Sequence, residues 1–312
     1  MESLKLSFEC VVPIFLLISL GYALRAFNVV KKETFNAMNK LVFKVFLPIL
    51  LFKNIYETDI GKVFDLRYFC FIVVGVICVF IVGYVAVMFI TKDDSRRGVM
   101  LQGFFRSNFA ILGLPLIKSI CGEKSGGLAS LTVAIVVPLF NVLAVIALER
   151  FRNGNVELKP MLKGIITNPL IIACALGVAF VALGINLPNV FEKSISDISS
   201  IASPLAMIIL GASFTFSSLK GYGKDVTITV AVRLIIIPLI ILSIAALMEF
   251  RGEAIACLMV VFGSPVAVSS FAMAQQMGGD EKLAAQVVVV SSATCVLTIF
   301  GWVFLINSFQ LF

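Results

Sequence analysis

The sequence predicts an all-α integral membrane protein that crosses the bilayer as ten helices. Of its 312 residues, 60% are hydrophobic and 14% are charged, whereas a soluble domain is typically about 45–50% apolar and about 25% charged. The mean hydropathy is +1.07. A membrane helix needs about 20 apolar residues, so ten spans would occupy roughly 200 residues. The composition therefore excludes a soluble globule, and the remaining loops are too short to hold a folded soluble domain.

Ten apolar segments follow one another along the chain, separated by charged residues or by turns that contain Gly or Asn. The first half contains Phe8–Phe27, Asn39–Tyr56, Tyr68–Ile90, Val99–Lys118 and Leu128–Leu148. The second half contains Gly164–Leu183, Ile198–Phe216, Val226–Met248, Ala254–Met277 and Ala284–Ile306. Each is long enough to cross a bilayer. We expect the first to be retained as a span, because it lacks the small-residue cleavage site of a signal peptide.

The basic residues predict the orientation of these spans, because cytoplasmic loops collect Lys and Arg. One alternate set of loops carries fourteen basic residues and the other carries eight. The richer set, which includes Arg96 and Arg97, is predicted to be cytoplasmic, so both termini should lie outside. The net charge of +7 then reflects the orientation of the spans in the membrane and does not indicate nucleic-acid binding. We expect a multi-pass protein of a bacterial inner membrane.

The absence of two kinds of residue limits the reactions and ligands that the protein can support. The chain contains no histidine, which excludes His-ligated zinc, His-ligated haem and Ser-His-Asp catalysis. All eighteen acidic residues fall in loops or near span ends, whereas cation and proton antiporters usually carry an acid at the membrane midplane. We therefore expect no metal site, no cofactor and no enzymatic activity. A membrane enzyme that acts on lipid-linked substrates is a distant alternative, since clustered acids are not apparent.

The two halves of the chain resemble each other. At an offset of 156 residues, half the chain length, three pairs match: Pro13 with Pro169, Gly21 with Gly177, and Pro48 with Pro204. This match predicts one five-helix repeat over residues 1–156 and a second over 157–312. Because five is odd, the second copy enters the membrane from the opposite side. Such inverted repeats are typical of secondary transporters.

Each half contains one span that Gly, Pro and polar residues interrupt. In the fourth span these are Gly103, Ser107, Asn108, Gly113 and Pro115, and in the ninth they are Gly263, Ser264, Pro265, Ser269 and Ser270. Proline is tolerated in the first turn of a helix and disrupts its interior. Pro265 is thus predicted to begin a half-helix whose free N–H groups face a cavity, where an anion would be stabilised.

Arg106 is the basic residue that the sequence places deepest in this region. It lies nine residues after Arg97, which at 1.5 Å per residue is roughly 13 Å into the membrane. An anionic substrate would suit this charge, although the side chain could instead snorkel to the surface or hold backbone carbonyls. The candidate substrate-binding residues are Asn108, Arg106, Ser107, Ser264, Pro265, Ser269 and Gln275, with Gly113, Pro115 and Gly263 shaping the interruptions. Asn141 is a weaker candidate.

These motifs resemble the auxin efflux carrier family, which includes plant PIN carriers and bacterial permeases for malate and malonate. The resemblance lies in residues 106–116, 264–276, 41–48 and 166–170 and extends over essentially the whole chain. It implies two crossed broken helices, a scaffold domain from spans 1, 2, 6 and 7, a transport domain from spans 3–5 and 8–10, and a homodimer. Ser107 stands where plant carriers have Pro, and Gln275-Gln276 where they tend to have Lys-Glu.

The sequence thus favours a secondary transporter of small organic anions, such as malate, malonate or auxin-like acids, that works by alternating access. The alternative is a symporter of the related bile-acid type, coupled to sodium or to protons. In that alternative, backbone carbonyls with Asn108, Ser264 and Gln275 would hold the sodium ion. The substrate and the lipid bilayer are the partners that both interpretations require.

Overall fold

The computed structural model describes residues 2–57, 65–109, 116–117, 120–122, 127–152, 163–164, 166–214 and 219–311. These residues form α-helices and two short π-helices, η1 and η3. In chain order the elements are α1 (Glu2–Ala26), α2 (Lys32–Leu41), η1 (Val42–Phe46), α3 (Leu47–Tyr56), α4 (Leu66–Ile90), α5 (Asp94–Phe105), α7 (Gly127–Arg152), α9 (Pro169–Ala182), α10 (Asn189–Ser213), α11 (Leu219–Ala231), η3 (Val232–Ile236), α12 (Ile237–Leu247), α13 (Glu253–Gly263), α14 (Ser269–Gln276) and α15 (Glu281–Ser308).

Among the described residues, six helical stretches are long and apolar enough to cross a membrane on their own. They are Lys32–Tyr56, Leu66–Ile90, Leu131–Arg152, Asn189–Ser213, Gly221–Leu247 and Glu281–Ser308. Three shorter apolar helices are Val12–Ala26, Pro169–Ala182 and Glu253–Gly263. Each of these stretches overlaps one of the ten predicted spans. The predicted class, an all-helical membrane protein, is confirmed.

Several helices begin well before the apolar segments that predicted them. The second helical stretch starts at Lys32 rather than Asn39, and α10 starts at Asn189 rather than Ile198. These predicted starts are wrong because hydropathy detects the apolar part of a helix and not its polar first turns. In α2, Phe35 and Asn39 are buried while most neighbouring side chains are exposed, so one face alone joins the core.

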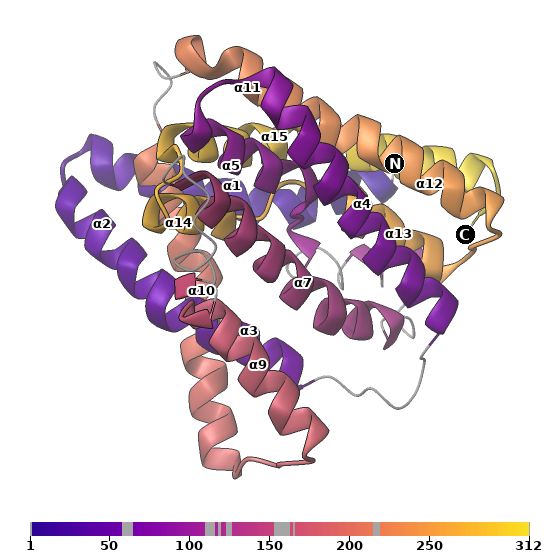
Figure 1. Ribbon diagram of the computed structural model, residues 1–312, viewed down its shortest axis with the longest axis horizontal. Helices are drawn as coiled ribbons and strands as arrows, with labels where there is room; N and C mark the ends of the chain where they lie inside the picture. The colour runs from indigo at the N-terminus through magenta and orange to yellow at the C-terminus, as the bar shows by residue number, and fades with distance from the viewer. Residues whose placement is uncertain are drawn as a thin grey trace.

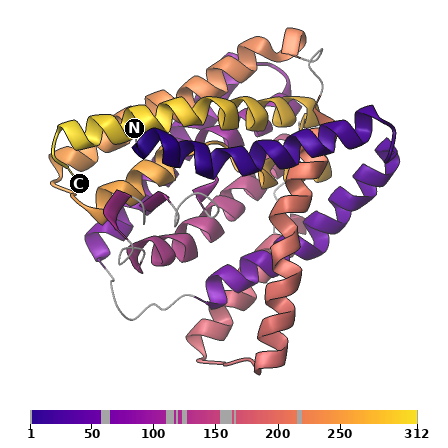
Figure 2. The same ribbon diagram turned by 180° about the vertical axis from the view of Figure 1, so that it is seen from behind.

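The helices pack in two groups (Figures 1 and 2). In the first group α1 packs along α10, and α3 packs along α9. The second group contains α4, α5, α7 and α11–α15, in which α5 packs against α4 and α7, and α15 against α11. Figure 2 shows α1 running beside α15, with the two chain ends at the same end of the molecule. The groups therefore meet along α1 and α15, among other contacts.

Glycine allows the closest helix contact in the first group. A Cβ atom on Gly21 would collide with the carbonyl oxygen of Ile208, and one on Gly211 would collide with that of Ile18. The backbones of α1 and α10 thus touch at two reciprocal positions. Close approach of this kind depends on small residues in membrane helices.

Acidic and amide side chains begin several helices by accepting backbone N–H bonds, as N-caps do. Asp65, Asp93, Asn168 and Asp280 cap α4, α5, α9 and α15. At Asp93, the hydrogen bond from the Ser95 hydroxyl lowers the pKa of the carboxyl.

A charge cluster joins three of the helix ends in the second group. Arg96 donates to Asp225 at 3.0 Å, and its Nε lies 3.7 Å from the carboxylate of Asp280. The Arg96 guanidinium also stacks 4.5 Å from the ring centre of Tyr222. These contacts hold the beginnings of α5 and α15 against α11.

Both π-helices precede a proline. Pro48 follows η1 and Pro238 follows η3, and proline has no N–H with which to close the preceding turn. The carbonyl of Leu234, four residues before Pro238, accepts a hydrogen bond from Nε1 of Trp302 on α15 at 2.9 Å. A side chain thus takes the place of the missing backbone donor.

Candidate functional site

Two extended segments pair with each other within the second group of helices. The helix α5 ends at Phe105, and Arg106 has extended backbone angles (φ −84°, ψ 115°). The helix α13 ends at Gly263, and α14 begins at Ser269. In the segments that follow α5 and α13, Ser107 pairs with Val266 in an isolated antiparallel β-bridge. The N–H of Asn108 donates to the carbonyl of Pro265 at 2.9 Å. Residues more than 150 positions apart thus meet as paired backbone.

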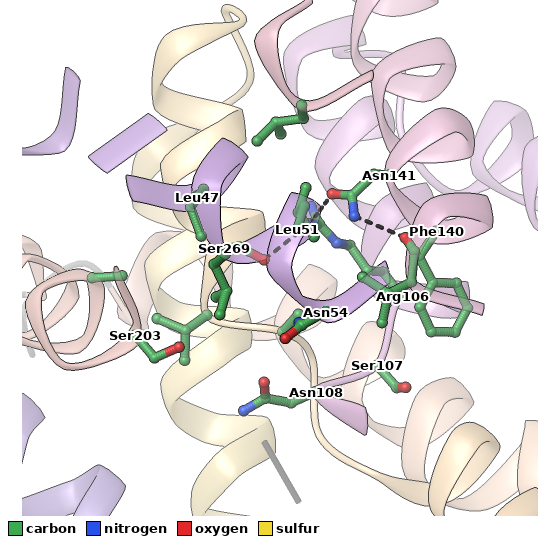
Figure 3. Close-up of a pocket in the computed structure, with 16 residues that line it drawn as sticks. Leu47, Leu51, Asn54, Arg106, Ser107, Asn108, Phe140, Asn141, Ser203 and Ser269 are labelled. Atoms are coloured by element: carbon green, nitrogen blue, oxygen red, sulfur yellow. Dashed lines mark hydrogen bonds between the residues drawn. The ribbon is translucent and has the colours of Figure 1, made fainter. Parts of the chain in front are cut away.

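A cavity of about 630 Å³, including its open mouth, lies beside these paired segments. The wall comes from α3, the segment after α5, α7, α9, α10 and the segment before α14, so both helix groups contribute. Its polar residues are Asn54, Arg106, Ser107, Asn108, Asn141, Ser203 and Ser269, and most of the remaining wall is aliphatic. Figure 3 shows these side chains around the cavity. An apolar pocket with a few converging polar groups is the usual form of a small-molecule site.

Arg106 supplies the positive charge of this cavity. Its side chain is 4% exposed, and one terminal nitrogen donates to Asn141 at 2.7 Å and to Ser269 at 2.9 Å (Figure 3). The other terminal nitrogen donates to the sulfur of Met273. A guanidinium has five N–H donors, and these three bonds leave two of them without a partner among the described residues. The side chain does not snorkel to the surface, and among the described residues its partners are side chains and not backbone carbonyls.

Asn108 presents a buried donor that has no protein partner among the described residues. Its side chain is 4% exposed, and its amide nitrogen makes no hydrogen bond. The Ser107 hydroxyl is also buried and has no hydrogen-bond partner in the described part of the chain. Because buried polar groups are nearly always hydrogen-bonded, and both of these groups belong to residues that line the cavity, they are candidate contacts for a ligand.

The charges of the described lining residues are one-sided. Arg106 contributes a cation, and no Asp or Glu is among the residues that line the cavity. Within the described part of the chain, no group of His, Cys, Asp and Glu side chains could hold a metal ion. The cavity is therefore suited to an anion that can accept hydrogen bonds from Arg106 and Asn108.

Comparison with known proteins identifies the family. The family model described as "Membrane transport protein" matches residues 6–156 and 152–303. The chain belongs to this family, the auxin efflux carrier family. It is therefore a multi-pass membrane transporter and not an enzyme, which confirms the resemblance seen in the sequence.

Its relatives cover nearly the whole transporter. An uncharacterized transporter of Methanothermobacter thermautotrophicus is 25% identical over 95% of this chain and 97% of its own. One of Methanocaldococcus jannaschii is 26% identical over 95% and 98%. A protein of Rhizobium meliloti named "Putative malonate transporter" is 22% identical over 96% and 95%.

Other predicted residues of the transporter lie outside the cavity wall. Ser264 is buried, donates to the carbonyl of Val260 and lies with Pro265 in the extended segment after Gly263. Gln275 is at the far end of α14, where it donates to Glu281 at 2.7 Å and accepts from Asn39. Gly113 and Pro115 lie outside the described residues. Of the predicted set, the structure brings Arg106, Ser107, Asn108 and Ser269 to one cavity.

Sequence reasoning missed two polar residues of this cavity and ranked a third too low. Asn54 and Ser203 line it from α3 and α10, and Asn141 orients the Arg106 side chain. A single polar residue within an apolar run is the signal that Asn141 gives, whereas Asn54 follows Lys53 near the end of its span and does not stand out. Ser203 precedes Pro204, so its local sequence suggested only a kink.

Proposed function

We propose that this transporter carries small organic anions, mono- or dicarboxylates such as malate, malonate or auxin-like acids, by alternating access. The substrate carboxylate would bind at the paired segments between Arg106 and Asn108. The observation that carries this proposal is a buried arginine that faces a cavity with no carboxylate among its described lining residues. The name of the Rhizobium meliloti relative supports a carboxylate substrate.

The remaining donors match one carboxylate group. Two free N–H groups of Arg106 and the unpaired amide of Asn108 could donate to its two oxygens. Leu47, Leu51 and Phe140 would enclose the carbon skeleton. A cavity of this composition favours a compact acid with an apolar or lightly polar body.

The two helix groups support alternating access. We assign α1, α2–η1–α3, α9 and α10 to the scaffold domain, and α4, α5, α7 and α11–α15 to the transport domain. The cavity walls come from both groups, so a movement between them would change access to the substrate. The short backbone pairing of Ser107 with Val266 would travel with the transport domain, as would Arg106 and Asn108. In this proposal the segments after α5 and α13 are the crossed broken helices of a 5+5 inverted repeat, residues 1–156 and 157–312.

The membrane potential sets the direction of such transport. Moving one charge across 100 mV changes the free energy by about 2.3 kcal/mol. With the cell interior negative, an uncoupled anion leaves the cell downhill, and uptake would need a coupled sodium ion or proton. A symporter coupled to sodium or to protons is therefore the second candidate function. Flux measurements distinguish it from uncoupled anion transport.

The decisive experiment is uptake of labelled malonate, malate and an indole acid into proteoliposomes at both signs of the membrane potential. We expect flux that follows the potential. Replacing Asn108 with Ala should reduce the apparent affinity roughly 10- to 100-fold, because a hydrogen bond to a charged group contributes about 1.5–3 kcal/mol. Arg106→Gln should reduce it at least as much.

Two substitutions of the same types at exposed positions serve as controls for indirect effects on folding. Asn307 and Arg251 are exposed residues remote from the cavity lining, so Asn307→Ala and Arg251→Gln should leave flux unchanged. Flux that ignores the potential but requires sodium or a pH gradient would indicate symport. Absence of flux for every acid would reject the carboxylate proposal.

Two further expectations belong to the same proposal. The family resemblance supports a homodimer through the scaffold helices, which cross-linking in native membranes would test. The distribution of Lys and Arg supports a bacterial inner-membrane location with both termini outside.

A further inference from the structure

Arg233 is a second buried arginine, and the proposed substrate site does not use it. Its side chain on η3 is 0% exposed, and its guanidinium contacts four backbone carbonyl oxygens. Nε donates to Ser264 at 2.9 Å, and one terminal nitrogen donates to Val261 at 2.7 Å. The other terminal nitrogen donates to Phe104 and Phe105, each at 3.2 Å. The ion pairs among the described residues do not include Arg233.

These four carbonyls belong to the C-terminal ends of two helices. Phe104 and Phe105 are the last residues of α5, and Val261 and Ser264 lie in the last turn and at the C-cap of α13. Carbonyls at such ends have no partner within the helix and carry its negative partial charge. In secondary transporters, carbonyls at interrupted helix ends hold Na⁺ or H⁺. Here a guanidinium stands at that position.

We propose that Arg233 is a tethered cation. It permanently supplies the positive charge that a co-transported monovalent cation would otherwise supply where α5 and α13 end. Two features support this role. All four of its partners are oxygens, the ligand type that hard cations prefer, and they come from the ends of both α5 and α13 and not from one helix. The π-helix from which it projects is a type of distortion that is frequent at functional sites.

A tethered cation has a consequence for coupling. The guanidinium remains with α5 and α13 through the transport cycle, so no ion is bound and released there with the substrate. Removing the side chain should expose four carbonyls to which Na⁺, K⁺ or Li⁺ can bind. One expectation of this inference, that carboxylate flux needs no sodium, rests on the proposed function. Its binding test uses no substrate, so the two proposals can fail separately.

The test is the melting temperature of the purified full-length transporter in NaCl, KCl, LiCl and choline chloride at equal ionic strength. The wild-type melting temperature should be the same in all four salts. Arg233→Ala should melt lower in choline chloride, and at least one small cation should raise its melting temperature by a few degrees. Arg251→Ala is the matched control. Arg251 is exposed and also donates to backbone carbonyls, those of Ala246 and Phe250, but water can replace it.

Arg233→Lys keeps a positive charge at the same position and should remain insensitive to the choice of cation. This variant and the wild-type measurement keep the proposal testable if Arg233→Ala does not fold. Equal destabilisation of Arg233→Ala in all four salts would show that Arg233 only braces the helices, and would overturn the proposal. A wild-type melting temperature or carboxylate flux that depends on sodium would overturn it as well.

Discussion

Arg106 and Asn141 lie 35 positions apart in the chain, and their contact determines how much positive charge the cavity can offer. The Asn141 side chain is uncharged, so its 2.7 Å hydrogen bond orients the guanidinium without neutralising it. A carboxylate at this position would form an internal ion pair with Arg106. The pairing of an amide with a buried arginine thus preserves the charge for a ligand.

Asn141→Asp should therefore weaken anion binding. We expect at least a tenfold loss of apparent affinity for the transported acid, equivalent to about 1.4 kcal/mol, because the new carboxylate competes for the same donors. The thermal stability should not fall, since the guanidinium gains a charged partner. Uptake kinetics and the melting temperature together check both expectations.

Asn141→Leu is the matched control for this prediction. It leaves an Arg106 donor without a partner, which costs about 1–3 kcal/mol of stability, but it retains the cationic charge. Affinity should therefore suffer less in Asn141→Leu than in Asn141→Asp. The reverse order would contradict an electrostatic role for Arg106.

At this scale the sequence predicts residue types better than contacts. Arg106 and Asn108 stand out because they are polar residues in an apolar span. The partners of Arg106 do not stand out in this way. Ser269 and Asn141 come from other helices, so their contacts with Arg106 depend on how the helices pack. Gln275 is six residues beyond Ser269 on the same helix, roughly 9 Å at 1.5 Å per residue, which explains why it lies apart from the cavity.

At the scale of elements, the contact of α1 with α10 is the one that tolerates least change. Gly21→Ala or Gly211→Ala would place a methyl group against the opposite backbone carbonyl. Overpacking of this kind costs about 1–3 kcal/mol. We expect a lower melting temperature and a lower yield in the membrane, measured by thermal unfolding of the purified variants.

Gly301→Ala on α15 provides the control, because a Cβ at Gly301 would meet no atom within 4 Å. Alanine in a helix interior is favoured over glycine by about 0.5–1 kcal/mol, so this variant should be neutral or more stable. If Gly21→Ala and Gly301→Ala behave alike, the backbone contact is not what limits stability.

The sequence predicts the existence of helices better than it predicts where they start or where they are distorted. Apolar runs predict α4 and α15 well because both are apolar over most of their length. The polar first turns of α2 and α10 carry no hydropathy signal. The π-helices depend on Pro48 and Pro238 together with distant partners such as Trp302, so no local pattern predicts them.

At the scale of the whole molecule, the charge distribution of the loops makes a prediction about sidedness. The turn at Lys92, between α4 and α5, belongs to the basic set, whereas Asn186 lies in the turn between α9 and α10. A cysteine at Lys92 should react with an impermeant thiol reagent only after intact cells are permeabilised. A cysteine at Asn186 should react before, and both residues are exposed.

The unmodified protein gives the background of this measurement, because exposed Cys70 and Cys78 lie on α4. We expect little background from them, since a lipid-facing helix is shielded from a water-soluble reagent. The opposite pattern at Lys92 and Asn186 would reverse the orientation and place both termini inside.

The hydrogen bond between Trp302 and Leu234 gives the transporter an optical reporter of its own. Trp302 is the single tryptophan of the chain, and its indole N–H is bonded one residue away from Arg233. Indole emission depends on hydrogen bonding and on the polarity around the ring. Any rearrangement of α15 against η3 will therefore change the colour or intensity of the intrinsic fluorescence, without a label and without a second tryptophan to obscure it.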